Sequence, residues 1–210
     1  MEVRWDDGLE PKITDIKAEV NNGQVTLNFK WPNELEHIYI YKQNILKEEI
    51  IDWEKPYRKY TKDEYASFGG FKDTGLANAM SKYTLCPYIQ GDLKSYIVCY
   101  KDGSNEIEVI GQQIQIRYTI KEKKKLFSSR KVIQMQIFTD SPIPKSYLCY
   151  VKKRGSIPVG LEDGMRFQFI SDFIAGDNSL PEIEVDKDEY IRIYLTEEVP
   201  YKEAYRIIKS

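Results

Sequence analysis

The chain has 210 residues, of which 41% are hydrophobic and 30% are charged, and its formal net charge is -2. This near balance of charge argues against a general nucleic-acid binder, which would carry a basic excess. No apolar run approaches the ~20 residues of a membrane span, and the first residues lack the apolar core of a signal peptide. The sequence therefore predicts no membrane insertion. The compartment would be cytoplasmic if Met1 is native and extracellular if the chain is a fragment.

The first third of the chain has the pattern of strands. Apolar and polar residues alternate over residues 24–31, the period of a strand with one buried face. A rougher strand, residues 13–20, precedes it, and Asn22-Gly23 supplies the positive φ of a tight hairpin turn. Ile and Tyr alternate over residues 38–41, which indicates a central strand covered on both faces.

The alternation fails over residues 45–70 and then returns. Ile45–Trp53 is predicted as a short helix or an edge strand, and strands are expected at residues 83–88 and 96–100. Lys101–Asn105 contains Asp-Gly-Ser and breaks both the pattern and the composition, so it is the predicted linker between two domains.

The second half repeats the strand pattern. Predicted strands cover residues 114–120, 133–137, 147–151, 167–169, 183–185, 191–195 and 205–208. Short strands without intervening helices indicate an antiparallel sandwich. The expected fold class is all-β, with two tandem immunoglobulin-like β-sandwich domains at residues 1–105 and 106–210.

An ordered set of motifs runs through residues 10–103. Its members are Pro11, Ile13, Ile16 and Ala18, then residues 25–32 (Val-Thr-Leu-Asn-Phe-Lys-Trp-Pro), 38–41 (Ile-Tyr-Ile-Tyr), 71–76 (Phe-Lys-Asp-Thr-Gly-Leu) and 83–85 (Tyr-Thr-Leu). Together they resemble a fibronectin type III domain. In that family a core Trp ends the second strand, and a Leu and a Tyr form a corner whose Tyr hydroxyl bonds backbone. The resemblance gives these roles to Trp31, Leu76 and Tyr83, and the second domain resembles the family only in general pattern.

Residues that could carry chemistry have little support. The single histidine, His37, lies in a predicted strand without a flanking motif, so a catalytic triad is not indicated. Carboxylate pairs are common, but they fall in turns or on polar faces where solvated charge is usual. Asp186-Lys187-Asp188-Glu189 lacks the spacing of a calcium loop. No catalytic residue, metal site or cofactor is therefore predicted.

Two further groups have competing interpretations. The basic run Lys121–Lys125 with Arg130-Lys131 is predicted as a solvated hairpin turn, so no nucleic-acid partner is expected. The three cysteines have no CxxC spacing and are predicted as buried thiols. A bond between Cys86 and Cys99 is the alternative if their strands are neighbours.

The candidate partner-binding residues lie in an aromatic stretch between residues 53 and 71. They are Trp53, Tyr57, Arg58, Tyr60, Tyr65 and Phe68. Aromatic and Arg side chains dominate binding hot spots, and planar rings stack on sugar faces. The competing interpretation is that these rings pack over the edge of the sandwich or against the second domain, because large aromatics are mostly buried.

Three functions follow from these patterns. The resemblance implies binding, spacing or scaffolding, usually inside a larger protein, so the first hypothesis is a non-catalytic interaction or spacer module with a protein or carbohydrate partner. The second is an accessory carbohydrate-binding module of a polysaccharide-degrading enzyme, with the aromatic stretch as its platform. The third is a small glycoside hydrolase that uses paired carboxylates across a cleft.

Overall fold

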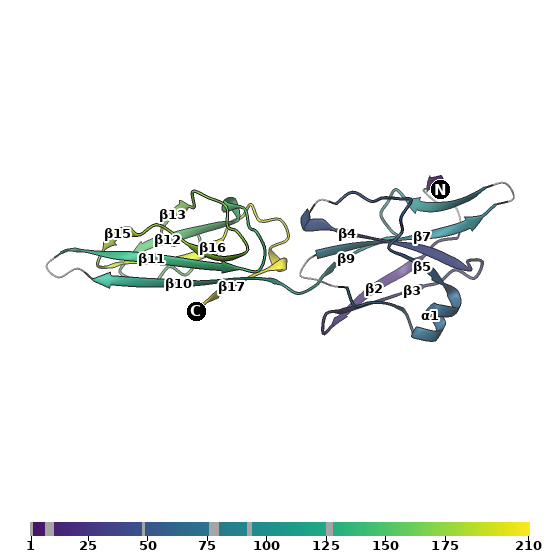
Figure 1. Ribbon diagram of the computed structural model, residues 1–210, viewed down its shortest axis with the longest axis horizontal. Helices are drawn as coiled ribbons and strands as arrows, with labels where there is room; N and C mark the ends of the chain where they lie inside the picture. The colour runs from purple at the N-terminus through teal and green to yellow at the C-terminus, as the bar shows by residue number, and fades with distance from the viewer. Residues whose placement is uncertain (1, 7–10, 48, 76–79, 92–93, 125–127) are drawn as a thin grey trace. The chain divides into compact units, whose positions relative to one another are not determined.

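The computed structural model describes residues 2–6, 11–47, 49–75, 80–91, 94–124 and 128–210 (Figure 1). Within these residues the chain is all-β apart from one short α-helix and three single 3-10 turns, as the sequence predicted. The chain divides into two compact units, residues 1–112 (unit 1) and residues 113–210 (unit 2). Each unit contains a pair of sheets, consistent with a β-sandwich. In the part of the chain described, no helix is long and apolar enough to cross a membrane.

Unit 1 has a sheet of six strands and a sheet of three. Its elements are β1 (Glu2–Asp6), β2 (Thr14–Asn21), β3 (Gln24–Lys30), β4 (His37–Asn44), β5 (Arg58–Thr61), α1 (Lys62–Phe68), β6 (Phe71–Asp73), β7 (Met80–Gln90), β8 (Ser95–Tyr100) and β9 (Glu106–Ile110). The larger sheet pairs its strands in the order β1-β8-β7-β4-β5, with β9 also paired to β7, and the smaller sheet has the order β2-β3-β6. Figure 1 shows β2 and β3 on one side of unit 1 and β4 and β7 on the other.

The hairpin between β2 and β3 confirms the predicted turn. Asn22 and Gly23 both have positive φ, at 50° and 78°, as a two-residue hairpin of this type requires. The alternation that predicted β3 also holds, since Val25, Leu27 and Phe29 are buried against the other sheet.

The larger sheet of unit 1 is covered on both faces. Ile38 and Ile40 of β4 belong to the core between the two sheets. Tyr39 and Tyr41 lie in a second cluster on the opposite face, where Trp53 packs over them. These four side chains of β4 are all buried, as the alternation of Ile and Tyr predicted. Part of the irregular stretch after β4 therefore serves as a cover for this second face.

The structure bears on two of the three roles that the resemblance gave to Trp31, Leu76 and Tyr83. The Tyr83 hydroxyl donates to the Asp73 carboxylate at 2.6 Å, and not to backbone as the resemblance implied. Trp31 follows directly after β3 and is only partly buried, with its indole N–H donating to the Leu35 carbonyl at 2.7 Å. Leu76 lies outside the described residues.

Helix α1 was not predicted. The described residues of Ile45–Trp53, which are 45–47 and 49–53, contain no strand and one 3-10 turn, Ile45–Lys47. The sequence nevertheless carries both ends of α1. Thr61 and Glu64 form a capping box, in which the Thr61 side chain accepts from the Glu64 backbone and Glu64 accepts from the Thr61 backbone. Gly69, at φ 64°, ends the helix in the left-handed conformation. The helix is short and has no buried residue, so it lacks the apolar period that reveals longer helices.

The loop predicted as a linker lies inside unit 1. Residues 101–105 form a turn, and β9 follows and pairs with the first half of β7, from Met80 opposite Ile110 to Thr84 opposite Glu106. Strand pairing thus continues beyond the break in pattern, and the division between the units falls between Gln112 and Gln113.

Unit 2 has a sheet of five strands and a sheet of three. Its strands are β10 (Ile114–Lys124), β11 (Arg130–Thr139), β12 (Leu148–Arg154), β13 (Met165–Gln168), β14 (Gly176–Ser179), β15 (Ile183–Asp186), β16 (Glu189–Leu195) and β17 (Tyr205–Lys209). One sheet has the order β14-β11-β10-β17 with β15 on β11, and the other has the order β13-β12-β16. Alternate residues of β11 (Ile133, Met135, Ile137) and of β16 (Ile191, Ile193) are buried.

Candidate functional site

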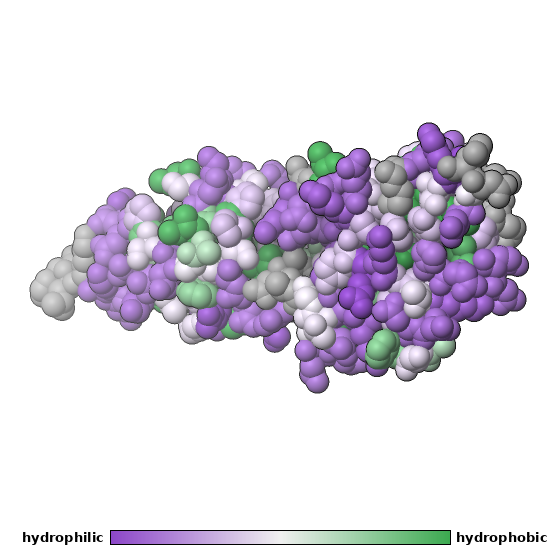
Figure 2. All heavy atoms as spheres, turned by 45° about the vertical axis from the view of Figure 1, so that its right-hand side comes forward, coloured by the Kyte–Doolittle hydropathy of each residue, from purple (hydrophilic) through white to green (hydrophobic). Residues whose placement is uncertain are grey.

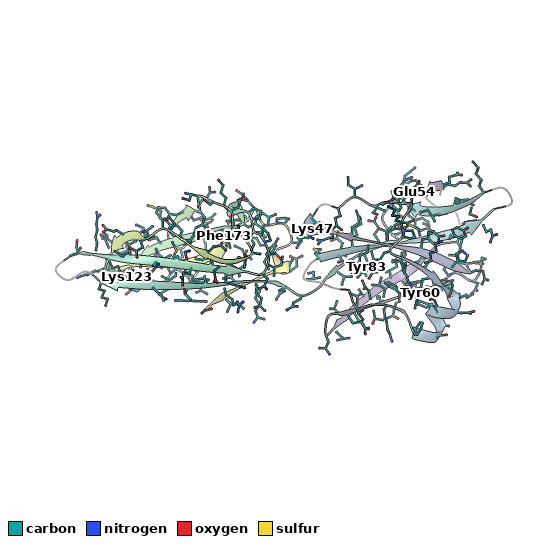
Figure 3. All side chains as sticks on the ribbon, in the orientation of Figure 1. Lys47, Glu54, Tyr60, Tyr83, Lys123 and Phe173 are labelled. Atoms are coloured by element: carbon teal, nitrogen blue, oxygen red, sulfur yellow. The ribbon has the colours of Figure 1, made fainter. Side chains whose placement is uncertain are left out.

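Tyr60 is a core residue that also borders a surface pocket of unit 1. Its side chain is 4% exposed, and its hydroxyl donates to the Gly70 carbonyl at 2.9 Å. Its ring meets Phe71 edge-on between the two sheets of unit 1, where Figure 3 marks Tyr60 and Tyr83. The buried ring offers almost no surface on which a ligand could stack.

Tyr65 and Trp53 are also held by structural contacts. The Tyr65 hydroxyl donates to the Phe29 carbonyl at 2.6 Å and accepts from the Phe29 N–H at 2.9 Å, so α1 is attached to the end of β3. Trp53 meets Tyr41 edge-on at 4.9 Å, and its carbonyl accepts a hydrogen bond from the Tyr41 hydroxyl. Each of these two rings is thereby partly buried by its own unit.

The other three candidate residues line the surface pocket that Tyr60 also borders. Tyr57 and Phe68 are 47% and 57% exposed, and Arg58 is exposed with one weak ion pair to Glu64 at 3.4 Å. Together with Lys72 they line a pocket of about 410 Å³ beside β5 and β6. The aromatic stretch therefore divides into a packed part and a smaller exposed part, Tyr57, Arg58 and Phe68, beside which lies Lys72.

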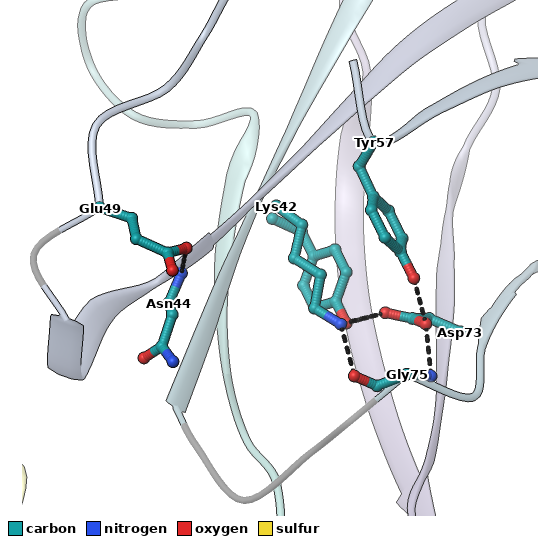
Figure 4. Close-up of polar contacts among 7 residues, drawn as sticks. Lys42, Asn44, Glu49, Tyr57, Asp73 and Gly75 are labelled. Atoms are coloured by element: carbon teal, nitrogen blue, oxygen red, sulfur yellow. Dashed lines mark hydrogen bonds and ion pairs between the residues drawn. The ribbon is translucent and has the colours of Figure 1, made fainter. Parts of the chain in front are cut away.

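A buried carboxylate lies beneath this pocket. Asp73 is 3% exposed and accepts four hydrogen bonds: from Lys42 Nζ at 2.7 Å, Tyr57 at 2.6 Å, Tyr83 at 2.6 Å and the Gly75 N–H at 2.7 Å (Figure 4). Asp73 ends β6 in the smaller sheet, whereas Lys42 and Tyr83 come from β4 and β7 in the larger sheet. The carboxylate thus links the two sheets of unit 1.

The contacts of Asp73 shift three pKa values. Burial alone would raise the pKa of Asp73, but the hydrogen bonds from Lys42, Tyr57 and Tyr83 outweigh burial and lower that pKa to about 2. Burial, and then the bond to Asp73, raises the pKa of Tyr57 to about 12 and raises the pKa of Tyr83 further. The carboxylate is therefore ionised and fully bonded at neutral pH, which suits a structural role better than proton transfer.

A second, more apolar pocket lies in unit 2 and was not predicted. It has a volume of about 510 Å³, and its lining includes Tyr150, Phe169, Phe173, Ile170 and Ile174. Phe169 and Phe173 are buried and meet edge-on at 5.2 Å, and Tyr150 is half-buried. In contrast, Ile170 and Ile174 are 79% and 67% exposed. Figure 3 marks Phe173, and Figure 2 shows apolar patches on the surface of unit 2.

The loop that carries these isoleucines is fixed in place. Phe173 and Ile143 exchange two backbone hydrogen bonds, at 2.8 and 2.9 Å. The Asn178 side chain accepts from the Ile174 N–H and donates to the Ile174 carbonyl, both at 2.9 Å. The exposed apolar side chains are therefore presented on an ordered loop. A signal was available in the sequence, because residues 167–174 (Phe-Gln-Phe-Ile-Ser-Asp-Phe-Ile) are more apolar than one edge strand needs.

Most carboxylates of the acidic clusters in unit 2 face cations. Ion pairs in unit 2 join Arg166 to Glu162 and Glu197, Arg154 to Asp186 and Asp188, Lys153 to Asp163, and Lys152 to Glu189. A glycosidase instead needs one carboxyl as a free acid and the other as a base or nucleophile.

His37 stacks on Tyr88 with ring centroids 4.5 Å apart, and Tyr88 stacks in turn on Tyr39.

The basic run lies largely in a strand and is partly neutralised. β10 continues to Lys124, so most of the predicted turn is strand, and residues 125–127 lie outside the described residues. Lys123 pairs with Glu182 at 2.7 Å. Lys131 is buried and pairs with Glu122 at 3.1 Å.

Comparisons with protein-family models, with curated proteins and with solved structures found no significant match for this chain. The functional argument therefore depends on the geometry of the described residues.

Proposed function

We propose that this chain is a non-catalytic interaction module whose first unit is a diverged fibronectin type III-like sandwich. The order of strand pairing supports the family assignment. Strands β2-β3-β6 correspond to the A, B and E strands of immunoglobulin-like folds, and β4-β7-β9 correspond to C, F and G. Additional features of unit 1 are β1, helix α1 and the cover that contains Trp53.

The observation that carries the binding proposal is the pocket in unit 2 with its two exposed isoleucines. Single exposed apolar side chains are ordinary, but a group of them beside an apolar hollow is typical of an interaction site. Because Asn178 and Ile143 already fix the loop, little conformational entropy is lost when a partner orders it. A preformed apolar pocket of this size fits one or two side chains of a protein partner.

The charges at the pocket favour a particular kind of partner segment. Asp172 and Asp177 are among the lining residues, and within the described residues that line it there is neither Lys nor Arg. Asp172 Oδ1 accepts from the Lys145 N–H, which fixes its orientation. We therefore propose that the partner contributes an apolar side chain flanked by Lys or Arg.

A displayed peptide library selected on the whole chain would test this proposal. Selected peptides are expected to share an apolar residue next to a basic one. Ile174→Asp should weaken their binding at least about tenfold, because it places a charge where an apolar side chain must pack. Val159→Asp is the matched control, since Val159 is exposed in unit 2 but does not line the pocket. The proposal would be contradicted if the selected peptides bound the Ile174→Asp variant as tightly as they bind the unchanged chain.

Carbohydrate binding is the second candidate function, and the pocket of unit 1 favours it. Tyr57 and Phe68 offer exposed rings beside that pocket, with Arg58 and Lys72 as hydrogen-bond donors. On a glycan array, this function predicts a signal that Phe68→Ser reduces at least about fivefold and that Ile174→Asp leaves unchanged. Equal signals from both variants, or no signal from the unchanged chain, would remove this candidate.

A further inference from the structure

Cys86 and Cys99 lie side by side on neighbouring strands of unit 1. The ladder between β7 and β8 runs from Tyr88 opposite Ile97 to Gln90 opposite Ser95, and the two cysteines lie two residues beyond its inner end. Their Sγ atoms are 2.8 Å apart. A disulfide needs about 2.0 Å between the sulfurs, and its Cα spacing of about 4.4–6.8 Å includes the spacing of facing residues on antiparallel strands. We propose that Cys86 and Cys99 form a disulfide bond.

The surroundings explain what the bond would do. Near Cys86 the backbone of β7 changes partner, because Met80–Thr84 pair with β9 whereas Tyr88–Gln90 pair with β8. Residues Tyr96–Tyr100 of β8 pair with β1 on the other side of the strand. A covalent link at this point ties β8 to β7 where the ladder between them ends. It also closes a short loop, which reduces the conformational freedom of the unfolded chain.

Burial determines when the bond can form. Both thiols are fully buried in the second cluster of unit 1, and Trp53 packs against that cluster. Burial also raises the pKa of the Cys86 thiol, which disfavours the reactive thiolate. The native thiols are therefore inert. The bond forms while the local β7–β8 hairpin has aligned the cysteines but the cover has not closed, or during local opening.

The chemistry is thiol–disulfide exchange with an external disulfide, such as oxidised glutathione or a protein oxidant. One cysteine thiolate attacks the external disulfide and displaces one thiol. The second cysteine then attacks the resulting mixed disulfide and displaces the other thiol. One S–S bond breaks and one forms, two protons leave the cysteines, and the two electrons reduce the external disulfide to two thiols.

Mass spectrometry after refolding in a glutathione redox buffer tests the bond directly. The denatured, unreduced protein should be alkylated at one cysteine, Cys149, and its mass before alkylation should be lower than that of the reduced chain by two hydrogen atoms. Proteolysis should give one species that joins the peptides of Cys86 and Cys99. Alkylation at all three cysteines, or glutathione adducts in place of the joined peptides, would overturn the proposal.

A melting experiment provides an independent readout. Reduction before refolding should lower the Tm of unit 1 by about 10 °C or more, given the loop of 14 residues that the bond closes. The Tm of Cys86→Ala/Cys99→Ala should not respond to reductant. Cys149→Ala is the control, because Cys149 is buried in unit 2, and this variant should keep the full response. The bond would be contradicted if reduction no longer lowered the Tm in Cys149→Ala, or if it still lowered the Tm in Cys86→Ala/Cys99→Ala.

Discussion

Asp73→Asn is expected to lower the free energy of unfolding of unit 1 by about 3–5 kcal/mol. The amide keeps the shape of the side chain, but it removes the charge that faces Lys42 and turns an acceptor into a donor toward a Tyr hydroxyl. Lys42 is mostly buried, with its side chain 14% exposed, so its ammonium has limited access to water as a substitute partner. Because Asp73 joins the two sheets, the loss should affect the whole of unit 1.

Tryptophan fluorescence in a urea titration measures this effect selectively, since Trp5, Trp31 and Trp53 all belong to unit 1. Glu108→Gln is the matched control, because it neutralises an exposed carboxylate on β9 of the same unit. It should change the unfolding free energy by about 0.5 kcal/mol or less. If Asp73→Asn unfolded at the same urea concentration as Glu108→Gln, the Asp73 carboxylate would not stabilise the link between the two sheets of unit 1.

The same carboxylate should make unit 1 sensitive to acid. The pKa of Asp73 is about 2 in the folded protein, below its ordinary value of 3.8, so on acidification the unfolded state takes up the proton first. The stabilisation, about 2.5 kcal/mol, is complete above about pH 4 and disappears as the pH falls toward 2. Asp73→Asn should lack this component, so the difference in unfolding free energy between the two proteins should narrow by about 2 kcal/mol between pH 4 and pH 2.

Tyr60→Ala is expected to destabilise unit 1 by about 3–5 kcal/mol, the usual cost of truncating a buried aromatic side chain. The substitution leaves a cavity against Phe71 and removes the hydrogen bond to the Gly70 carbonyl. Tyr60→Phe isolates the second contribution and should cost about 1 kcal/mol. The same fluorescence titration in urea measures both variants.

Phe68→Ser is the control from the same pocket, because the ring is largely exposed on α1. Its unfolding free energy should stay within about 0.5 kcal/mol of that of the unchanged chain. If Tyr60→Ala were equally mild, Tyr60 would return to the list of candidate binding residues and the packing interpretation of the aromatic stretch would be wrong.

Contacts distant in the sequence explain most of what the sequence patterns missed. Tyr60 and Phe68 look alike in the sequence, yet one lies between the sheets and the other lies in solvent. The difference arises because β5 pairs with β4, with Ile38 opposite Tyr60, and this register turns Tyr60 toward the core. No local pattern contains that register. Asp73 was likewise just one residue in a family motif, and its role depends on side chains from two other strands.

The sequence by itself determined the all-β class, the hairpin at Asn22-Gly23 and the two covered faces of β4, because period-two alternation and turn chemistry act over a few residues. Tertiary structure decided which aromatic rings are buried, that β9 belongs to unit 1, and that the exposed isoleucines border a pocket. It also brought the two cysteines together. These features depend on which strands pair and in what register, and the free energy of that choice comes from contacts across the whole unit.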